Sequence, residues 1–514
     1  MNMVELPWRR PAGKPLRIGL VNPPSAFLLD ERVFASLGLL KIASVLEAAG
    51  HRVEVLDLSG IENYTEVVED YLAVAEIDAI GITATTPQLP SVMRVARTIR
   101  ERRPALRQIL GGPHVTLAYA ALKAENKRAV IGGRAARAVD KLEEMFDVLV
   151  AGDGEFAVFE AIGPNPPKMI DGDDHNGKNF LSHATYEDSP LPARHLIDLA
   201  SYKYTIEGRP STSLIAQLGC PFGCGFCGGR SSKALRVIRT RSSDSIVREV
   251  EFLYKTYGYT GFMFYDDELN VNPKIVELMN KLCDLQSRLG VDFRLRGFVK
   301  SELFTDEQGE AMKRAGFSWL LCGYEAAHPR ILTNIDKRAT LEDNTRAVEI
   351  GKKHGLKVKG LMSIGHPGES EDTIRAIHDW LIACQVDDFD CTIITPYPGT
   401  PYHDMAVPHD SLPGVWTYTH RKTGDRLHAR EVDYTVTADY YKGIPGGGYQ
   451  AFVFTDHLSG ERLVEMRDWL EDDVRKALGI PFNAGRAALR FDHSMGQGLP
   501  DFILRGSAKP VVPA

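Results

Sequence analysis

The sequence predicts an α/β protein with an N-terminal doubly wound, Rossmann-like parallel sheet, then a partial (β/α)6 TIM-type barrel and a small α+β C-terminal region. Two observations carry this prediction. Five short apolar runs alternate with helical stretches before residue 160, and six strand–helix units follow from residue 211. Parallel strands that are covered on both faces form nearly continuous apolar runs, and helices connect them. A chain of 514 residues is long enough for several such cores.

The first five strands are expected in short apolar runs that end in small or hydroxylated residues. These runs are LRIGLVNPP, VEVLDLSG, DAIGITATT, RQILGGPHV and DVLVAGDGE. Ligands of such sheets bind at the carboxyl ends of the strands, where glycine lets a large group approach the backbone. Neither GxGxxG nor GxxxxGK[ST] follows a strand, which disfavours a nucleotide. The alternative is that the glycines only form turns.

Composition changes predict the domain boundaries. A connector rich in Pro, Gly, Asp and Asn separates the two apolar patterns, and periodicity changes again after the sixth strand–helix unit. We expect a sheet domain, a connector, a barrel and a C-terminal region that caps the barrel and shapes the substrate pocket: residues 1–160, 161–198, 199–410 and 411–514.

Charge and hydropathy exclude several classes of protein. The net charge is −7 and the pI about 6.1, whereas a protein that binds nucleic acid needs a basic face. No apolar run reaches the roughly 18 to 20 residues of a membrane span, and the first residues lack the apolar stretch of a signal peptide. We therefore expect a cytoplasmic protein that binds no nucleic acid.

Three of the seven cysteines lie within the stretch GCPFGCGFCGG, with the spacing CxxxCxxC. A [4Fe-4S] cluster takes one thiolate per iron, so Cys220, Cys224 and Cys227 leave one iron open to a chelating ligand. The surrounding glycines let the loop wrap around the cluster, and Phe226 supplies an apolar wall. The alternatives are a zinc knuckle completed from elsewhere, or three buried thiols.

Charged residues follow the later barrel strands, at the end where barrel enzymes place their chemistry. The acidic run Asp266, Asp267 and Glu268 follows the second strand, and Glu325 follows the fourth. The three residues of the acidic run have an alternative role as caps of the helix that follows. Arg294 and Arg296 share one face of the third strand, where each either meets a carboxylate of a ligand or forms a structural ion pair. His366 is either a catalytic base or a loop histidine.

The motif CxxxCxFC after the first barrel strand resembles that of the radical S-adenosylmethionine (radical SAM) superfamily. FYDDE, GYEAA, GLMSIGHPGES and TPYPGTP are similar to its later strand-end elements. The order NPP, GIT, GGPH and GDGE in the first 160 residues resembles the cobalamin-binding domain that precedes many radical SAM enzymes. The resemblance covers residues 15–405. Two departures are Leu218, where this branch commonly has Arg, and Ala326, where it has Ser; the cobalt-binding DxHxxG signature is absent.

The resemblance implies three cofactors and assigns residues to each. The [4Fe-4S] cluster is held by Cys220, Cys224 and Cys227. The residues implied for S-adenosylmethionine (SAM) are Phe226, Asp266, Asp267, Glu268, Arg296 and Glu325. The residues implied for cobalamin are Asn22, Ser25, Thr83, Thr85, Thr86, Gly111, Gly112, Pro113, Gly152, Gly154 and Glu155.

The resemblance also implies the reaction. Reductive cleavage of SAM at the cluster gives a 5′-deoxyadenosyl radical, and methylcobalamin delivers a methyl group to an unactivated carbon of the substrate. The expected partners are a small-molecule or lipid-like substrate and an electron donor of the flavodoxin or ferredoxin type. Two alternatives remain: oxidative cyclisation, rearrangement or dehydration without methyl transfer, and a non-enzymatic cobalamin or iron–sulfur sensor.

The last hundred residues carry no motif. WTYTHRKTGDRLHAREVDYTV alternates around a turn and predicts a hairpin, and SGERLVEMRDWLEDDVRKALG predicts an amphipathic helix. Between them, the Gly-rich stretch of residues 444–448 is expected to be a flexible turn.

Overall fold

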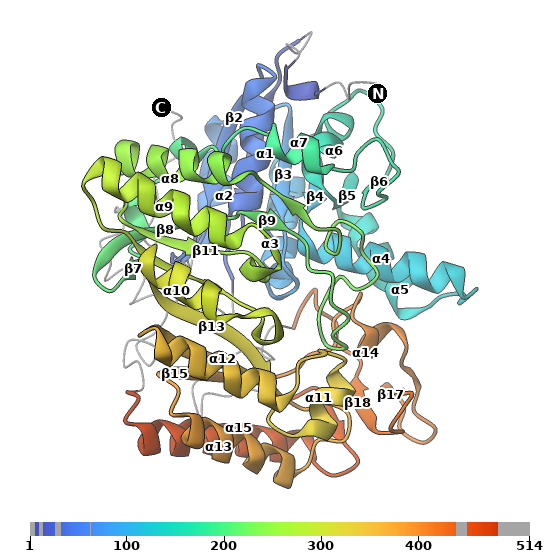
Figure 1. Ribbon diagram of the computed structural model, residues 1–514. Coiled ribbons are helices and arrows are strands. Elements are labelled where there is room, and N and C mark those ends of the chain that lie inside the picture. The colour runs from blue at the N-terminus through green and yellow to red at the C-terminus, as the bar shows by residue number, and fades with distance from the viewer. Residues whose placement is uncertain (1–5, 10–13, 26–31, 62, 438–449, 482–514) are drawn as a thin grey trace.

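The computed structural model describes residues 6–9, 14–25, 32–61, 63–437 and 450–481. The Gly-rich stretch of the C-terminal region therefore lies outside the described residues. Figure 1 shows the N-terminal sheet domain packed beside a curved barrel sheet, with a small antiparallel sheet below them. Among the described helices, none has the length and apolar character to cross a membrane.

The N-terminal domain is a parallel sheet with strand order β2-β1-β3-β4-β5-β6. Its strands are β1 (Arg17–Asn22), β2 (Arg52–Asp57), β3 (Ala79–Thr83), β4 (Arg107–Gly111), β5 (Val148–Gly152) and β6 (Met169–Gly172). Its helices are α1 (Leu37–Ala48), α2 (Tyr64–Val74), α3 (Leu89–Arg102), α4 (Pro113–Lys127), α5 (Arg134–Met145) and α6 (Gly154–Ala161). Two apolar cores cover its faces, one beneath α2 to α5 and the other beneath α1 and α6. The expected doubly wound sheet is confirmed.

The connector expected at residues 161–198 contains a sheet strand. β6 pairs in parallel with β5, from Leu149 beside Met169 to Gly152 beside Gly172. The sheet therefore extends past residue 160. Strand β6 was missed because only four residues form it and two of them, an aspartate and a glycine, are poor strand formers. The rest of the connector adds the short helix α7 (His183–Glu187).

The barrel sheet has the order β15-β14-β13-β12-β11-β8-β7. Six of these strands are parallel: β8 (Arg209–Leu214), β11 (Gly261–Phe264), β12 (Arg294–Phe298), β13 (Phe317–Glu325), β14 (Lys357–Ile364) and β15 (Asp388–Ile393). β7 (Thr205–Ile206) is antiparallel to β8. The helices between the strands are α8 (Ser243–Tyr257), α9 (Ile275–Leu289), α10 (Asp306–Arg314), α11 (Pro329–Ile335), α12 (Leu341–Lys353) and α13 (Glu371–Cys384). The six-unit partial barrel is thus confirmed.

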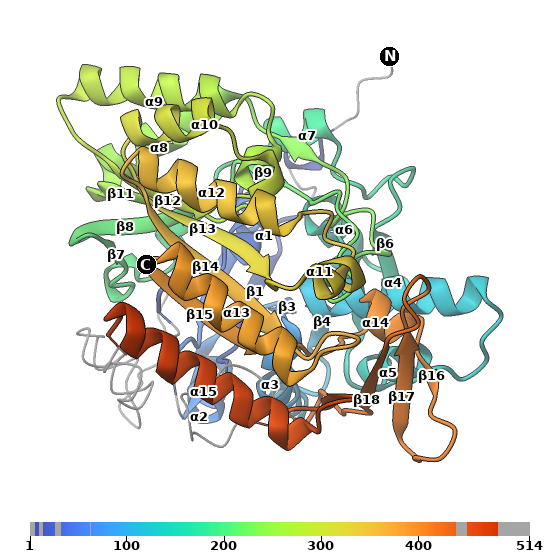
Figure 2. The same cartoon turned by 60° about the horizontal axis from the view of Figure 1, so that its bottom comes forward.

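The C-terminal region forms an antiparallel sheet of order β16-β17-β18-β19. Its elements are α14 (Pro401–Asp404), β16 (Val407–Pro408), β17 (Val415–Thr419), β18 (Arg426–Arg430), β19 (Val453–Thr455) and α15 (Gly460–Leu478). The predicted hairpin and helix are both present. Helix α15 lies beside α13 in Figures 1 and 2, and its leucines join the barrel core. The last helix therefore completes the barrel, although the sequence pattern placed it in a separate region.

Buried polar contacts fix the N-terminal domain against the barrel. Arg239 donates hydrogen bonds to Asp153, at the end of β5, and to the carbonyl of Leu181. The Asp173 carboxylate, just after β6, accepts from the backbone N–H of Ala234 at 3.0 Å. Residues of the predicted connector therefore support the segment that follows the three cysteines.

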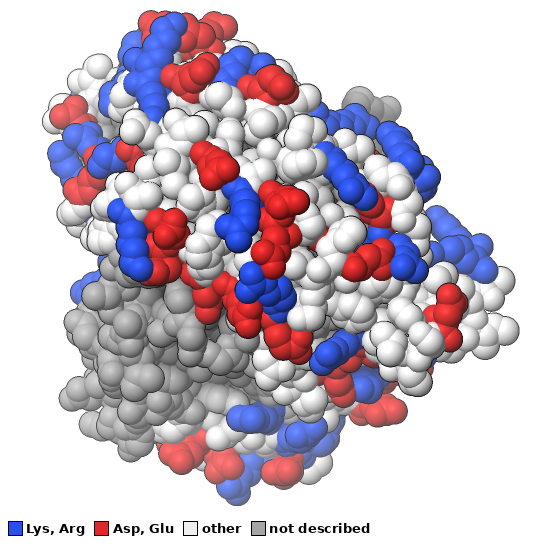
Figure 3. Space-filling model, turned by 90° about the horizontal axis from the view of Figure 1, so that it is seen from below, with Lys and Arg blue, Asp and Glu red and all other residues white. Residues whose placement is uncertain are grey.

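Basic and acidic side chains are intermixed on the face of the molecule seen from below (Figure 3). This face carries no broad basic surface among the described residues, which agrees with the net negative charge.

Candidate functional site

The three cysteines lie on a loop that begins after a short antiparallel pair, β9 (Gln217–Leu218) with β10 (Arg239–Thr240). The loop turns at Gly219, whose φ of 86° favours glycine. The backbone N–H of Cys227 donates to the carbonyl of Cys224 at 3.2 Å, and that of Gly225 to the carbonyl of Ile335 at 2.7 Å. Any Cβ at Gly225 would collide with the Tyr402 ring, so close packing requires this glycine.

The Asp266 carboxylate holds the start of the cysteine loop. Its carboxylate is buried and accepts hydrogen bonds from the backbone N–H groups of Ala216 and Gln217, at 3.0 and 2.6 Å. Burial raises the pKa of Asp266 to about 7. Both carboxylate oxygens accept from the protein backbone, and the assignment of Asp266 to SAM stays a prediction.

Three cations lie near the thiols: Arg230, Lys300 and Lys337. Arg230 Nη1 donates to the carbonyl of Cys220 at 3.3 Å, while its buried Nε has no hydrogen-bond partner among the described residues. Lys300 is buried over the Phe222 ring at 4.2 Å, and its Nζ donates to the carbonyl of Lys337 at 2.9 Å. Sequence reasoning missed these residues, because nothing in the local pattern shows that they meet the cysteine loop.

This donor set fits an anionic iron–sulfur cluster. Burial raises the pKa of all three thiols, that of Cys227 to about 12, and nearby Arg230 or the two lysines oppose this effect. Cluster ligands are thiolates, which such cations stabilise. Within the described residues, no three Cys, His, Asp or Glu side chains form a group that would bind a single metal ion.

Glu325 ends β13 in a left-handed conformation, with a φ of 67°, at a register shift against β14. Such a conformation is uncommon for a residue with a side chain and tends to occur at functional sites. Its carboxylate accepts from Lys337 Nζ at 3.0 Å and from the Ser363 hydroxyl at 2.7 Å. The carboxylate implied for SAM is therefore fixed from two sides at the mouth of the barrel.

His366 extends this chain of contacts to the cysteine loop. The Ser363 hydroxyl donates to Glu325 and so accepts from His366 Nε2 at 2.8 Å. The other ring nitrogen lies 3.4 Å from the Tyr402 hydroxyl, and the imidazole ring lies 5.4 Å from that of Phe226. Burial lowers the pKa of His366 to about 3, so the ring is neutral. Because His366 is fully buried between these partners, we interpret it as a residue that positions Ser363 and the cysteine loop.

The other acidic residues after β11 lie close to the same cations. Burial raises the pKa of Glu268 to about 7, against the effect of Lys337 and Lys300. Burial also raises the pKa of Asp267, against the effect of Arg230.

The two arginines of β12 differ: Arg294 forms an ion pair with Glu207 at 3.6 Å, whereas Arg296 has no ion pair with any described residue.

In the N-terminal domain the strand order reverses between β1 and β3, which is the usual ligand crevice of this topology. Asn22 and Thr83 end these two strands, and Thr85 and Thr86 lie in the turn after β3. Asn22 donates to Asp57 Oδ1 at 3.0 Å and to Ser59 at 2.8 Å. Thr86 is buried against His114 at 3.0 Å, and Thr85 is exposed beside the crevice. The carboxyl ends of β1 and β3 therefore fit a large cofactor that contacts the backbone.

The glycines expected to meet cobalamin are packed against the protein itself. A Cβ at Gly112 would lie 2.6 Å from the Thr83 hydroxyl, and one at Gly154 would lie 2.6 Å from Ile42. A Cβ at Gly152 would collide with the backbone of Gly172. Close packing therefore requires glycine at these positions, and their contact with cobalamin stays a prediction.

Glu155 faces a different hollow, of about 450 Å³, between α1, α6 and the start of the barrel. Lys41 shares this hollow and donates to Ser189 and to the carbonyl of Pro190. Burial lowers the pKa of Lys41 to about 8.

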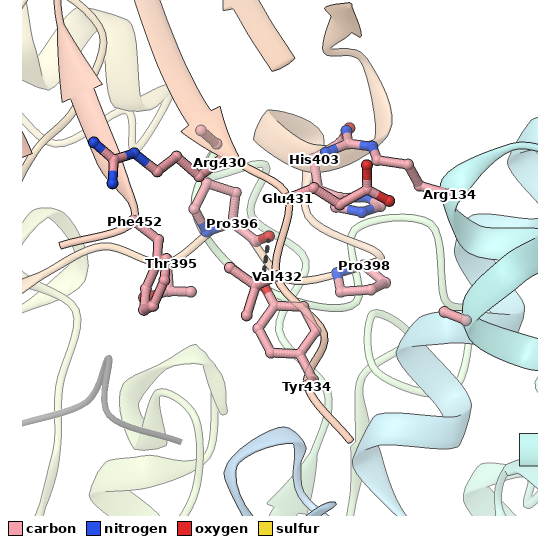
Figure 4. A pocket seen from close by; sticks show the side chains of 12 residues that line it. Arg134, Thr395, Pro396, Pro398, His403, Arg430, Glu431, Val432, Tyr434 and Phe452 are labelled. Carbon is pink, nitrogen blue, oxygen red and sulfur yellow. Dashed lines mark hydrogen bonds between the residues drawn. The ribbon is translucent and has the colours of Figure 1, made fainter. Parts of the chain in front are cut away.

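A second hollow, of about 480 Å³, lies where all three parts of the chain meet (Figure 4). Arg134 of α5 enters it from the N-terminal domain, and the segment of Thr395, Pro396 and Pro398 forms its barrel side. Tyr434 closes it from the C-terminal region and donates to the carbonyl of Pro396 at 3.2 Å. The C-terminal region therefore borders the strand ends of the barrel.

Comparison with known proteins gives two family matches. Residues 214–381 match the radical SAM superfamily, and residues 31–143 match the B12 binding domain. An uncharacterized methyltransferase of Pyrococcus horikoshii is 26% identical over 420 residues, which cover 78% of this chain and 85% of that one. The anaerobic magnesium-protoporphyrin IX monomethyl ester cyclase of Rubrivivax gelatinosus is 24% identical over 70% of this chain and 63% of its own.

Among solved structures, the radical SAM methyltransferase TsrM of Kitasatospora setae, with cobalamin and a [4Fe-4S] cluster bound, has a TM-score of 0.59. It is 18% identical, and the match covers 79% of this chain and 77% of that one. This likeness confirms the fold. The two domains together imply a [4Fe-4S] cluster, SAM and cobalamin as cofactors.

Proposed function

Because the chain is a radical SAM protein with a B12-binding domain, we propose that it transfers a methyl group to an unactivated carbon of a small-molecule or lipid-like substrate. When bound, the cluster and SAM supply a 5′-deoxyadenosyl radical, and cobalamin supplies the methyl group. One observation carries the proposal: three thiols and three cations meet at the mouth of the barrel, in a chain that also carries the B12-binding domain.

The proposed work of this chain's own residues is to bind, to orient and to exclude water. Cys220, Cys224 and Cys227 hold three irons and leave the fourth open. Asp267, Glu268, Glu325 and Phe226 bind SAM, and Asp266 supports the loop. Glu325 is kept in place by Lys337 and Ser363, so its carboxylate meets the ligand without reorganisation.

For cobalamin we propose the crevice between β1 and β3. On its two sides lie Asn22, Ser25, Thr83, Thr85 and Thr86, and the next strand ends at Gly111, followed by Gly112 and Pro113.

For the domain limits we propose that the sheet domain extends to residue 172, because β6 pairs with its sheet, and that α15 belongs to the barrel, because it packs on the barrel core.

For the substrate we propose binding between the barrel, the B12-binding domain and the C-terminal region. TsrM has been solved with its tryptophan substrate and a SAM analogue bound, which supports a compact organic substrate. The hollow lined by Arg134, Pro396 and Tyr434 then forms part of the route to the barrel. An acidic one-electron donor of the flavodoxin or ferredoxin type would reduce the cluster.

The test is the set of products formed from SAM under anaerobic conditions. The protein is reconstituted with iron, sulfide and cobalamin, reduced, and supplied with SAM that carries a deuterated methyl group. Methyl transfer predicts both 5′-deoxyadenosine and S-adenosylhomocysteine, and no SAM cleavage would contradict any enzymatic role. The Cys224→Ala variant is the control for cluster-independent products.

The second candidate is a radical reaction without methyl transfer, which the similarity to the Rubrivivax cyclase favours. It predicts 5′-deoxyadenosine without S-adenosylhomocysteine in the same assay. The ratio of these two products therefore decides between the candidates.

A further inference from the structure

The side chains that point into the barrel can be identified from the alternation of exposure along its strands. On β12, the partly exposed Arg294, Arg296 and Phe298 alternate with the buried Leu295 and Gly297. Alternate residues of a strand point to opposite faces, and the buried face packs against the outer helices. Arg294, Arg296 and Phe298 therefore face the interior at successive heights.

The end of the barrel interior near Arg294, where β12 begins, is closed by Glu207, in the turn after β7. Its carboxylate pairs with Arg294 at 3.6 Å and with Lys357 of β14 at 3.1 Å. β7 contacts β11 and β12 as well as its neighbour β8, so this turn lies across the bottom of the barrel. These two cations are partly exposed and share one carboxylate.

Arg296 lies one level higher and has no such partner. In the strand register Arg296 lies beside Trp319 and Trp319 beside Lys357, whose charge Glu207 already meets. Lys359, two residues further along β14, is buried between Asp388 at 2.8 Å and Asp390 at 3.0 Å. Arg296 stacks near the Trp319 ring at 5.9 Å, yet within the described residues it forms no ion pair and its buried Nε makes no hydrogen bond. Buried polar groups are nearly always satisfied, so an orphan group requires an explanation.

A second orphan group lies beside the first. The buried hydroxyl of Tyr204 has no hydrogen-bond partner of normal geometry among the described residues. Burial raises the pKa of Tyr204, and the positive charge of Arg296 together with a hydrogen-bond contact between the two side chains opposes that rise, so the two groups lie next to one another and present their remaining donors together. The Tyr204 ring is fixed against Phe34 at 4.7 Å.

We propose that Arg296 and Tyr204 form a subsite for a carboxylate of the substrate, deep in the barrel. A guanidinium and a phenol hydroxyl both donate hydrogen bonds, and a planar carboxylate accepts from both. One unmatched positive charge suits a monoanion better than a phosphate dianion. The inference rests on the proposed function in so far as the ligand is the substrate of that reaction.

The residues above the subsite indicate the rest of the ligand. Phe34 contacts Tyr265 at a ring distance of 5.0 Å, and Tyr265 contacts Phe298 at 6.1 Å. These rings lie between Arg296 and the mouth of the barrel, so the body of the ligand is aromatic or otherwise apolar. The ligand class is an aromatic or apolar monocarboxylic acid.

The position of Arg296 along β12 places it away from the cysteine loop, where SAM is proposed to bind. Lys300, beside the cysteine loop, follows Arg296 by four residues, which is about 13 Å along an extended chain. This separation leaves room for a substrate between the carboxylate subsite and the reacting end of SAM. We therefore assign Arg296 to the substrate, whereas the sequence placed it with SAM.

The test compares two probes that differ only in charge, indole-3-acetate and indole-3-acetamide, by calorimetric titration of the full-length protein without SAM. A charge-assisted hydrogen bond is worth about 1.5–3 kcal/mol, so the acid is expected to bind at least about tenfold more tightly than the amide. Arg296→Gln should abolish this preference, and Tyr204→Phe should reduce it several-fold. Arg294→Gln, which removes the same charge from the same face of the strand, should retain it.

Equal binding of the two probes, no binding of either, or a preference that survives Arg296→Gln would overturn the proposal. Thermal unfolding of each variant confirms that it is folded. The titration requires no methyl transfer, so its result is independent of the product assay for the proposed function. A carboxylate preference together with absent methyl transfer would contradict that function alone.

Discussion

The strand ends of the two parallel sheets contain different chemistry. In the N-terminal sheet they present small residues, and Gly112 and Gly152 pack against neighbouring backbone or side chains. In the barrel they present charged groups, and Lys300, Lys337 and Glu325 are largely buried around the cysteine loop. We expect the first edge to contact a ligand through its backbone and the second to bind through side chains.

This difference explains why the two sites differ in how well a sequence describes them. A side-chain site requires particular residue types at particular spacings, as the three cysteines illustrate. A site that contacts its ligand through the backbone requires only a particular backbone shape. The sequence cannot distinguish a glycine that packs against the protein from a glycine that makes room for a ligand. Variants that separate these two kinds of site test the comparison.

The largest expected effect comes from the cysteine loop. Replacing any one of Cys220, Cys224 or Cys227 with alanine should reduce the iron content after reconstitution to background and abolish 5′-deoxyadenosine formation, because each thiolate holds a separate iron. Cys283→Ala, on the outer helix α9, is the matched control and should retain both. A variant of the loop that keeps its cluster would refute the assignment.

The next effect concerns the buried pair of Lys337 and Glu325. Lys337→Met leaves the Glu325 carboxylate buried without its cation and should lower the free energy of unfolding by about 3–5 kcal/mol. Adding Glu325→Gln should recover part of the loss, which denaturant unfolding measures.

The control for this pair is Lys353→Met. It breaks an exposed ion pair with Asp306 and should change the unfolding free energy by about 0–1 kcal/mol. Equal effects of the two lysine variants would show that the barrel site is not tightly organised.

A smaller effect is expected in the N-terminal domain, from the buried His114. Burial lowers the pKa of His114 to about 4, below the unfolded value of 6.5. Between these values the unfolded chain binds the extra proton, so stability falls as the pH decreases from 6.5 to 4, by up to about 1.4 kcal/mol per pH unit. His114→Gln should flatten the pH dependence by one proton, which denaturant unfolding at a series of pH values measures.

The smallest effect is expected at Tyr402. Its hydroxyl donates to the carbonyl of Asn334 at 3.2 Å, so Tyr402→Phe should lower the free energy of unfolding by about 1 kcal/mol. The ring that packs on Gly225 remains, and the iron content should therefore stay at the wild-type level. Loss of the cluster in this variant would mean that the hydroxyl, and not the ring, positions the loop.

The sequence predicted the parts of this molecule that local chemistry determines. The six barrel strands and the spacing of the three cysteines were predicted from the sequence, as were five of the six strands of the N-terminal sheet. Lys300, Lys337 and Ser363 could not be predicted as site residues, because they meet only when β12, β13 and β14 lie side by side. The backbone contacts of Asp266 could not be predicted for the related reason that its partners, Ala216 and Gln217, belong to a distant segment.

The central claim is that the three cysteines leave one iron free for SAM. Electron paramagnetic resonance of the reduced cluster tests this directly, in the wild-type protein with and without SAM. The account predicts that SAM shifts the g values of the cluster signal, because its amino and carboxylate groups bind the open iron. An unchanged spectrum at saturating SAM would contradict the claim.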